Sequence, residues 1–318
     1  MGVYSNLDQR DIEQIVGQYD RGNLSQWSAI PSGIENSNFL VELTELGDQT
    51  RYVLTLIEVA DFSRSQEVVD LMTHLKFYGC PLPDIVTSRS NQRLLTFRDS
   101  PVTLCTWLRG HHITHPTLAH CNQLGRALAQ FHQVASAFRP PTQQPYDAEW
   151  LATAIDRHAV ERSTDERQAL HHALSLYDDL LGANLPSGWT HGDAFRDNVL
   201  FLPDGTLSGL LDYFHAGSDP FVMDLAIAIN DWCGSMVSSE DGHPSAEALL
   251  KGYQQVRALE SEELSALPIA RVIAAARLLC SRLGTRDEQG RFRKDPEEYA
   301  TLLSQLIQAK GLAFRRYG

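Results

Sequence analysis

One stretch, residues 190–212, constrains the fold of this chain more than any other part of the sequence. It begins with the motif H-x-D, formed by His191 and Asp193, and Asn198 follows five positions after the aspartate. Two short apolar runs around a Pro-Asp-Gly turn come next, a strong hairpin signal, and they lead directly to Asp212. The pattern predicts a polar loop, a β-hairpin and a carboxylate at the end of the second strand, in that order.

This order of residue types fits the chemistry of phosphoryl transfer. A carboxylate must orient the attacking hydroxyl, and oxygen ligands must hold the Mg²⁺ that bridges the nucleotide phosphates. We expect Asp193 to be the catalytic carboxylate, Asn198 and Asp212 to bind Mg²⁺, and ATP to be the donor. His191 is expected to hold the turn and not to act as a base. Asp224, on a following helix, is expected to accept backbone amides of the loop, with a third metal ligand as the alternative.

A turn-rich loop without catalytic function is the competing interpretation. Short motifs such as H-x-D match by chance, and Asp and Asn side chains commonly form local turns. The hairpin, the strand-end carboxylate and the carboxylate on the next helix all follow in the order that a kinase requires. The complete order therefore favours a kinase.

The N-terminal part of the chain has the pattern of a small α+β lobe. Apolar residues recur at helical spacing in 8–19 and 63–78. Residues 39–46 and 51–57 alternate like a hairpin, and 92–97 is a further candidate strand. The predicted order is helix, hairpin, helix, strand.

After residues 101–110, which we interpret as a connector, the pattern is helical apart from the catalytic hairpin. A chain of 318 residues is also too long for one compact core. We therefore predict an α+β fold with two lobes. Residues 1–100 form a nucleotide-binding lobe, and residues 101–318 form a larger, mainly helical lobe for catalysis and acceptor binding.

Several segments resemble a known superfamily. Its general pattern is carried by 191–193, Asp212 and 219–226, and a narrower match is carried by 33–39, 52–56, 191–201 and 224–233. The chain resembles the homoserine kinases of the aminoglycoside phosphotransferase and choline kinase superfamily. The resemblance implies a protein-kinase-like fold with a small β-rich N-terminal lobe. It also implies ATP-dependent phosphorylation of the side-chain hydroxyl of L-homoserine, a step of threonine biosynthesis.

The resemblance places nucleotide contacts in the polar segment before the first strand of the hairpin. Gly33, Asn36, Ser37 and Asn38 are the candidates, with an ordinary hairpin lead-in as the alternative. Kinases of this fold usually carry a phosphate-binding lysine on the returning strand. Thr55 stands near that position and no lysine occurs between residues 33 and 65. The sequence therefore does not identify the group that neutralises the α- and β-phosphates.

A zwitterionic acceptor needs an anion for its ammonium and a cation for its carboxylate. Asp231 lies seven residues after Asp224, so one helix places both on the same face, and Asp231 is the candidate for the ammonium. Helix capping or a surface ion pair is the alternative for Asp231. Arg196, Arg277 and Arg282 are candidates for the carboxylate, and a structural arginine is the alternative for each.

Other acceptors also fit the motifs: an aminoglycoside, choline, an amino sugar or hydroxylysine. A pseudokinase-like binding protein is a further alternative, motivated by the missing lysine. The net charge of −13 disfavours nucleic acid and membranes as partners. Scattered cysteines and an N-terminal sequence without a signal pattern predict a cytoplasmic protein. The oligomeric state does not follow from the sequence.

Overall fold

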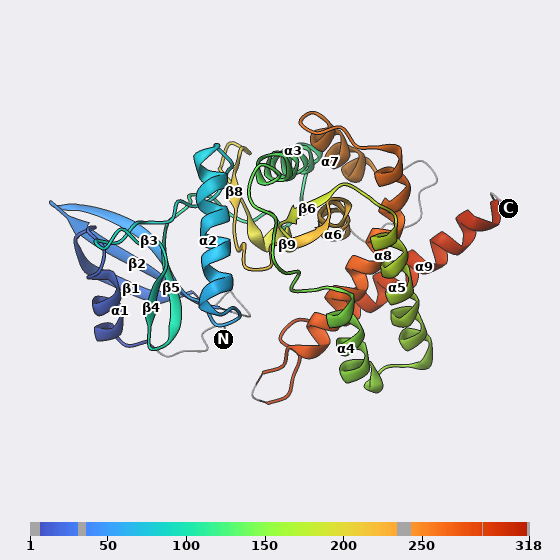
Figure 1. Cartoon of the computed structure of the whole chain (residues 1–318), viewed down its shortest axis with the longest axis horizontal. Helices are drawn as coiled ribbons and strands as arrows, with labels where there is room; N and C mark the ends of the chain where they lie inside the picture. Colours follow the sequence, from blue (N-terminus) through green and yellow to red (C-terminus); the bar gives the residue numbers. More distant parts are fainter. Residues whose placement is uncertain (1–6, 31–35, 234–242, 288, 317–318) are drawn as a thin grey trace. The chain divides into compact units, whose positions relative to one another are not determined.

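The computed structural model describes residues 7–30, 36–233, 243–287 and 289–316. The chain divides into two compact units (Figure 1). The first contains Met1–Gly110 together with Ser208–Phe214, and the second contains His111–Leu207 and His215–Gly318.

The first unit is built on an antiparallel sheet of five strands. In sheet order they are β1 (Asn23–Ala29), β2 (Ser37–Glu45), β3 (Asp48–Leu56), β5 (Ser100–Thr106) and β4 (Leu95–Phe97). Alternate residues of β2, such as Phe39, Val41 and Leu43, are buried, as the two-residue period of a strand requires. They form one core with Leu54 and Leu56 of β3.

Two helices complete this unit. α1 (Gln9–Val16) begins with a capping box between Asp8 and Asp11, and buries Ile12 and Ile15 in the core of the sheet. α2 (Phe62–Phe77) begins at the N-cap Asp61.

The interpretation of residues 101–110 as a connector is wrong. β5 runs from Ser100 to Thr106 and pairs with both β3 and β4. Pro101 cannot donate a ladder hydrogen bond, which restricts proline to strand ends, edge strands and bulges. It lies near the start of the strand, where its carbonyl accepts from Ile57 N at 2.9 Å. β1 was also not predicted, because its mostly exposed polar sequence lacks apolar alternation.

The second unit is mainly helical. Its helices are α3 (Leu118–Ala135), α4 (Ala148–His158), η1 (Ala159–Glu161), α5 (Thr164–Gly182), η2 (Arg196–Asn198), α6 (Val222–Trp232), α7 (Pro244–Gln254), α8 (Ser261–Gly284) and α9 (Glu297–Arg316). The strands β6 (Ser187–Thr190) and β9 (Gly217–Pro220) pair with each other. β7 (Val199–Phe201) precedes the predicted turn, in which Leu202 N donates to Thr206 O at 2.8 Å. β8 (Leu207–Leu210) follows the turn, and its residues from Ser208 onward belong to the first unit.

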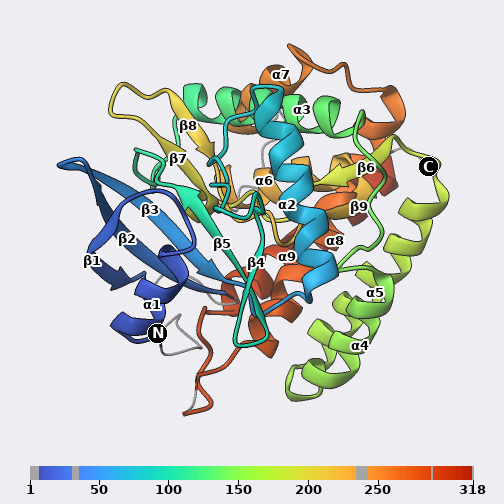
Figure 2. The same cartoon turned by 60° about the vertical axis from the view of Figure 1, so that its left-hand side comes forward.

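The α8 helix is the core of this unit and packs against α5, α6 and α9. Among the described residues it is the one helix long and apolar enough to cross a membrane. Of its most apolar window, 56% is buried inside the protein, so its composition is accounted for by packing. Figure 2 shows α8 beside α9.

The helices α3 and α7 approach each other closely (Figures 1 and 2). A Cβ atom on Gly125 would lie 2.0 Å from Leu249 O, and one on Gly252 would lie 1.9 Å from Asn122 O. Only glycine fits at such distances. The contact brings Tyr253, the residue after Gly252, against α3.

Candidate active site

The predicted catalytic loop leaves β6 at Thr190 and ends in η2. Gly192 has φ +76, and a Cβ atom there would lie 2.6 Å from His215 O. Both the conformation and the close approach require glycine. The loop is therefore fixed against the segment that follows Asp212.

Asp193 is held by its own loop. Asn198 Nδ2 donates to Asp193 Oδ2 at 2.5 Å and to Asp193 O at 2.9 Å. His215 Nδ1 lies 3.4 Å from the same Oδ2. Within the described residues, Asp193 Oδ1 has no hydrogen-bond partner. The arrangement orients one carboxylate oxygen and leaves the other available to an incoming hydroxyl.

Asp224 lies under the loop, fully buried on α6. It accepts the backbone N–H of His191 at 2.7 Å and that of Gly192 at 2.8 Å. His191 is also fully buried, and its Nδ1 accepts from Asp193 N at 3.3 Å. These contacts give Asp224 and His191 positions that support the loop, and their effect on catalysis stays a prediction.

The pKa of Asp224 reflects opposing influences. Burial, the largest, raises it. The hydrogen bond from His132, the electrostatic influence of His132 and His191, and the amide of Gly192 together lower it below the ordinary value. Asp224 is therefore ionised at neutral pH, the state in which it can accept from the loop.

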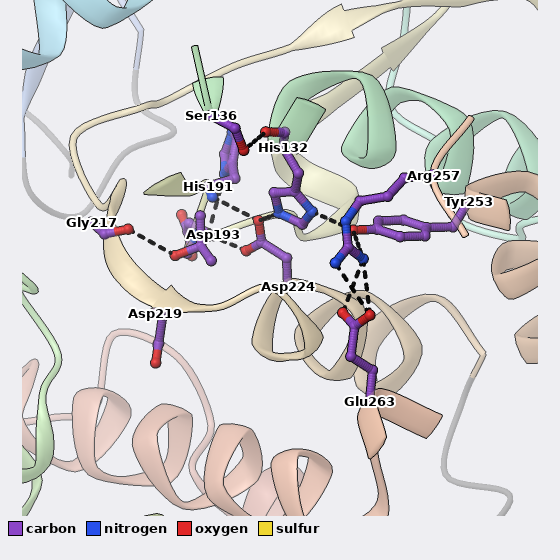
Figure 3. A network of polar contacts seen from close by, with 12 residues as sticks. His132, Ser136, His191, Asp193, Gly217, Asp219, Asp224, Tyr253, Arg257 and Glu263 are labelled. Carbon is purple, nitrogen blue, oxygen red and sulfur yellow. Dashed lines mark hydrogen bonds and ion pairs between the residues drawn. The ribbon is translucent and has the colours of Figure 1, made fainter. Parts of the chain in front are cut away.

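A chain of buried polar side chains continues from Asp224 (Figure 3). His132 Nε2 lies 2.9 Å from Asp224 Oδ2, and His132 Nδ1 lies 2.7 Å from the hydroxyl of Tyr253. Arg257 donates to that hydroxyl at 3.2 Å and forms an ion pair with Glu263 at 2.9 Å.

The hydrogen-bond donors in this network indicate the tautomer of His132. Because Arg257 donates to the Tyr253 oxygen, the hydroxyl proton is available for His132 Nδ1, and Nε2–H then points at Asp224. His132 also stacks on the Phe221 ring, with centroids 4.4 Å apart. The network fixes His132 on two sides and connects α7 and α8 to the loop.

The loop makes a second contact with α6 at its other end. Asp231 Oδ2 accepts from Arg196 N at 2.7 Å and from Arg196 Nε at 3.1 Å. Arg196 NH2 donates to Asp231 Oδ1 at 3.2 Å, and NH1 donates to Thr114 O at 3.1 Å. The two predicted substrate ligands therefore bind each other in this structure.

The Arg196–Asp231 pair lines a pocket of about 360 Å³ in the second unit. The other residues that line it are Thr114, His115, Pro116, Asn230, Trp232, Cys233, His243, Ser245, Glu298, Tyr299 and Leu302. Arg196 and the carboxylates of Asp231 and Glu298 give the pocket both signs of charge.

Arg277 and Arg282 do not line this pocket, as far as the structure describes it. Arg277 forms a buried ion pair with Asp219 at 2.7 Å and also donates to Tyr177. Arg282 pairs with Glu298 at 2.8 Å. Both guanidinium groups thus have structural partners, and their binding of an acceptor carboxylate stays a prediction.

The predicted nucleotide contacts lie in the first unit, except that Gly33 is outside the described residues. Asn36 Oδ1 accepts from Glu58 N at 2.9 Å, and Ser37 Oγ donates to Glu58 Oε2 at 3.1 Å. Both residues are buried. Their side chains join β2 to the end of β3, so contacts with phosphate would fall to backbone groups.

The position of the missing lysine is also accounted for structurally. Thr55 is buried and its hydroxyl donates to Asn38 Oδ1 at 2.7 Å. On α2, Arg64 and Glu67 form a buried ion pair. The first unit therefore contains a buried ion pair, but both of its partners lie on α2. Neither lies on β3, where kinases of this fold usually carry the lysine.

Asp212 adopts an unusual backbone conformation. It is exposed and its φ is +58, in the left-handed region that non-glycine residues seldom adopt. Such conformations cost about 1–3 kcal/mol and cluster at functional sites. Within the described residues, no group of three or more His, Cys, Asp or Glu side chains is arranged for a metal. Asp212 belongs to the first unit and Asn198 to the second, and binding of Mg²⁺ by these two residues stays a prediction.

Sequence reasoning missed His132, Tyr253, Arg257, Glu263 and His215. His132 had a weak signal, since it is a polar residue in the apolar stripe of α3. The others carried none, because the contacts that connect them to the loop and to α3, such as those of Tyr253 with His132 and of His215 with Asp193, join distant parts of the sequence.

The fold and this loop agree with the comparisons with known proteins. The chain belongs to the phosphotransferase enzyme family, whose model matches residues 26–263. More narrowly, it is similar to homoserine kinases. That of Parvibaculum lavamentivorans is 34% identical over 95% of both chains. That of Azorhizobium caulinodans is 35% identical over 89% of this chain and 88% of its own. The predicted resemblance is confirmed.

Solved structures show the same fold. An aminoglycoside phosphotransferase from Alicyclobacillus acidocaldarius aligns with a TM-score of 0.68 at 19% identity, covering 98% of this chain and 97% of its own. A choline kinase from Streptococcus pneumoniae aligns with a TM-score of 0.65 at 15% identity, covering 94% and 99%. The predicted α+β fold, with an N-terminal sheet and a helical remainder, is confirmed.

Proposed function

We propose that this chain transfers the γ-phosphoryl group of ATP to the side-chain hydroxyl of L-homoserine, which yields O-phospho-L-homoserine for threonine biosynthesis. The similarity to homoserine kinases along almost the whole chain carries the proposal. The fixed carboxylate of Asp193, with one oxygen oriented by Asn198, supports it chemically. We also propose that the reaction takes place in the cytoplasm.

Asp193 acts mainly by orientation. Its unpartnered oxygen accepts the hydroxyl proton and aligns the oxygen of the acceptor with the γ-phosphorus. Phosphoryl transfer is loose in most analyses, so positioning contributes more than early proton removal. The bonds from Asn198 restrict rotation of the carboxylate and preserve this alignment.

Mg²⁺ would be held by Asn198 and Asp212. Asn198 turns its amide nitrogen toward Asp193, so its oxygen is left for a cation, and oxygen donors are what Mg²⁺ prefers. When bound, the ion neutralises charge on the nucleotide phosphates. Backbone groups of residues 36–38 would contact the nucleotide.

The pocket beside Arg196 fits the acceptor. Arg196 lies three residues after Asp193, and each terminal nitrogen of its guanidinium retains one N–H for an acceptor carboxylate. Glu298 supplies negative charge for the ammonium, with 59% of its side chain exposed. A small zwitterion matches this combination better than a polycationic antibiotic.

A screen of hydroxyl acceptors with Mg²⁺ and ATP, following ADP release, tests the proposal. Homoserine should be phosphorylated fastest. Serine is one methylene shorter and threonine is also branched, so either hydroxyl would lie out of line when the amino-acid group is anchored. Faster turnover of choline or kanamycin would refute the acceptor and leave the kinase chemistry standing. No ADP release with any acceptor would refute both.

A further inference from the structure

The helix α6 holds the catalytic loop at two points. Asp224 accepts the amides of His191 and Gly192, on the N-terminal side of Asp193. Asp231 accepts the amide of Arg196, on its C-terminal side, at 2.7 Å. The two carboxylates are seven residues apart on one helix, so the catalytic carboxylate lies between two anchors on a single rigid element.

The second anchor is stronger than one backbone bond. The Arg196 side chain folds back on the same carboxylate through Nε and NH2, and NH1 reaches Thr114 O. Asp231 thus accepts three hydrogen bonds from one residue, and its side chain is only 10% exposed. Charge-assisted bonds of this bidentate kind are strong and geometrically specific.

We propose that Asp231 is a positioning residue that fixes the C-terminal half of the catalytic loop, in place of the role as ammonium ligand that its sequence position suggested. Most of its acceptor capacity is already filled by Arg196. Its effect on the reaction is exerted through the alignment of Asp193. The kinetic test of this inference requires the proposed function, whereas the hydrogen-exchange test does not.

Two substitutions at this position separate the two roles. Asp231→Asn removes the charge but keeps an oxygen that can accept from Arg196 N. Asp231→Ala removes both. If Asp231 is an anchor, the Asn variant should keep kcat within about threefold of the wild type, and the Ala variant should lose kcat by about tenfold, as for a lost bond that acts in the transition state.

A ligand for the ammonium behaves differently. Both variants would then raise the KM for homoserine by similar factors, because neither carries a charge, and kcat at saturation would change little. That result overturns the inference. Asp197→Asn is the matched control, since Asp197 lies in the same loop, is exposed and forms an ion pair with Lys294.

Hydrogen exchange of the Arg196 amide gives a readout that needs no turnover. Exchange should be slow in the wild type and in Asp231→Asn, and faster in Asp231→Ala, with the α6 amides unchanged. Fast exchange in the wild type overturns the inference even if Asp231→Ala does not fold. A wild type without kinase activity but with a protected Arg196 amide refutes the proposed function alone.

Discussion

His132 Nε2 lies 2.9 Å from Asp224 Oδ2, and neither side chain is exposed to solvent. The histidine is the link between the carboxylate that holds the loop and the Tyr253 hydroxyl. Replacing His132 with Leu leaves Asp224 with a buried, unmet hydrogen bond, a cost of about 1–3 kcal/mol. We expect a fall in kcat of roughly tenfold or more at unchanged KM for ATP.

Steady-state kinetics of the separate variants His132→Leu and Tyr253→Phe measure this fall in kcat. The Phe variant removes the bonds of the Tyr253 hydroxyl to His132 and Arg257 but keeps the bond between His132 and Asp224, so it should lose less than the Leu variant. Equal losses in both, or a loss confined to KM, would show that the histidine does not act through Asp224.

Asp224 also makes stability depend on pH in a defined direction. Its pKa is lowered below the ordinary 3.8, so its contribution is fully present above pH 3.8 and is lost as the pH falls through its folded value. The free energy of unfolding of the wild type should therefore exceed that of Asp224→Asn above pH 5. The difference should shrink below pH 3.8. Denaturant unfolding at several pH values checks this, and a difference that grows in acid would contradict it.

Replacing Asp193 with Ala removes the group that aligns the hydroxyl. We expect kcat to fall by at least about a hundredfold, the usual range for a positioned proton acceptor. KM for ATP should change little, because Asp193 does not hold the nucleotide. Near-normal turnover of Asp193→Ala on every accepted substrate would refute the mechanism, and Asp197→Asn should stay close to the wild type.

Removal of the metal should abolish turnover. Chelation of Mg²⁺ leaves the phosphate charge uncompensated in a protein of net charge −13. Asp212→Asn should lose turnover with an unchanged circular dichroism spectrum, and its need for Mg²⁺ should rise. Full activity in excess chelator, or in Asp212→Asn at ordinary Mg²⁺, would exclude this metal role.

The loop could be predicted because its chemistry is local. Asp193 and Asn198 are five residues apart, so the spacing placed both in one loop, and the structure joins them by a hydrogen bond. The helical period likewise placed Asp224 and Asp231 on one face of α6, where both contact the loop.

The remaining features depend on distant partners. His132 contacts residues 92 and 121 positions away, and no local pattern encodes such pairing. The strand β1 was missed because its mostly exposed polar sequence lacks apolar alternation, and β5, whose pairing with β3 joins distant segments, was interpreted as a connector. The partner of Arg196 was missed because Arg196 and Asp231 were each considered as ligands for an acceptor.

The two remaining arginine candidates differ in burial, and this predicts very different effects on stability. Arg277 is 9% exposed and its partner Asp219 is 1% exposed, whereas Glu298, the partner of Arg282, is 59% exposed. Removing one member of a buried pair typically costs about 3–5 kcal/mol, and an exposed pair contributes about 0–1 kcal/mol. Arg277→Met should therefore lower the free energy of unfolding far more than Arg282→Met.

The pH dependence of the stability lost in Arg277→Met shows whether the buried carboxylate of Asp219 causes the loss. Burial, reinforced by the charge of Asp224, raises the pKa of Asp219 well above its usual 3.8. A raised carboxyl pKa contributes stability below pH 3.8 that is lost as the pH rises toward the folded value. The defect of Arg277→Met should therefore grow from acid to neutral pH, and Asp219→Asn in the same chain should relieve part of it. Urea unfolding of the three variants measures this, and equal, pH-independent losses for Arg277→Met and Arg282→Met would show that the buried charge of Asp219 is not the cause.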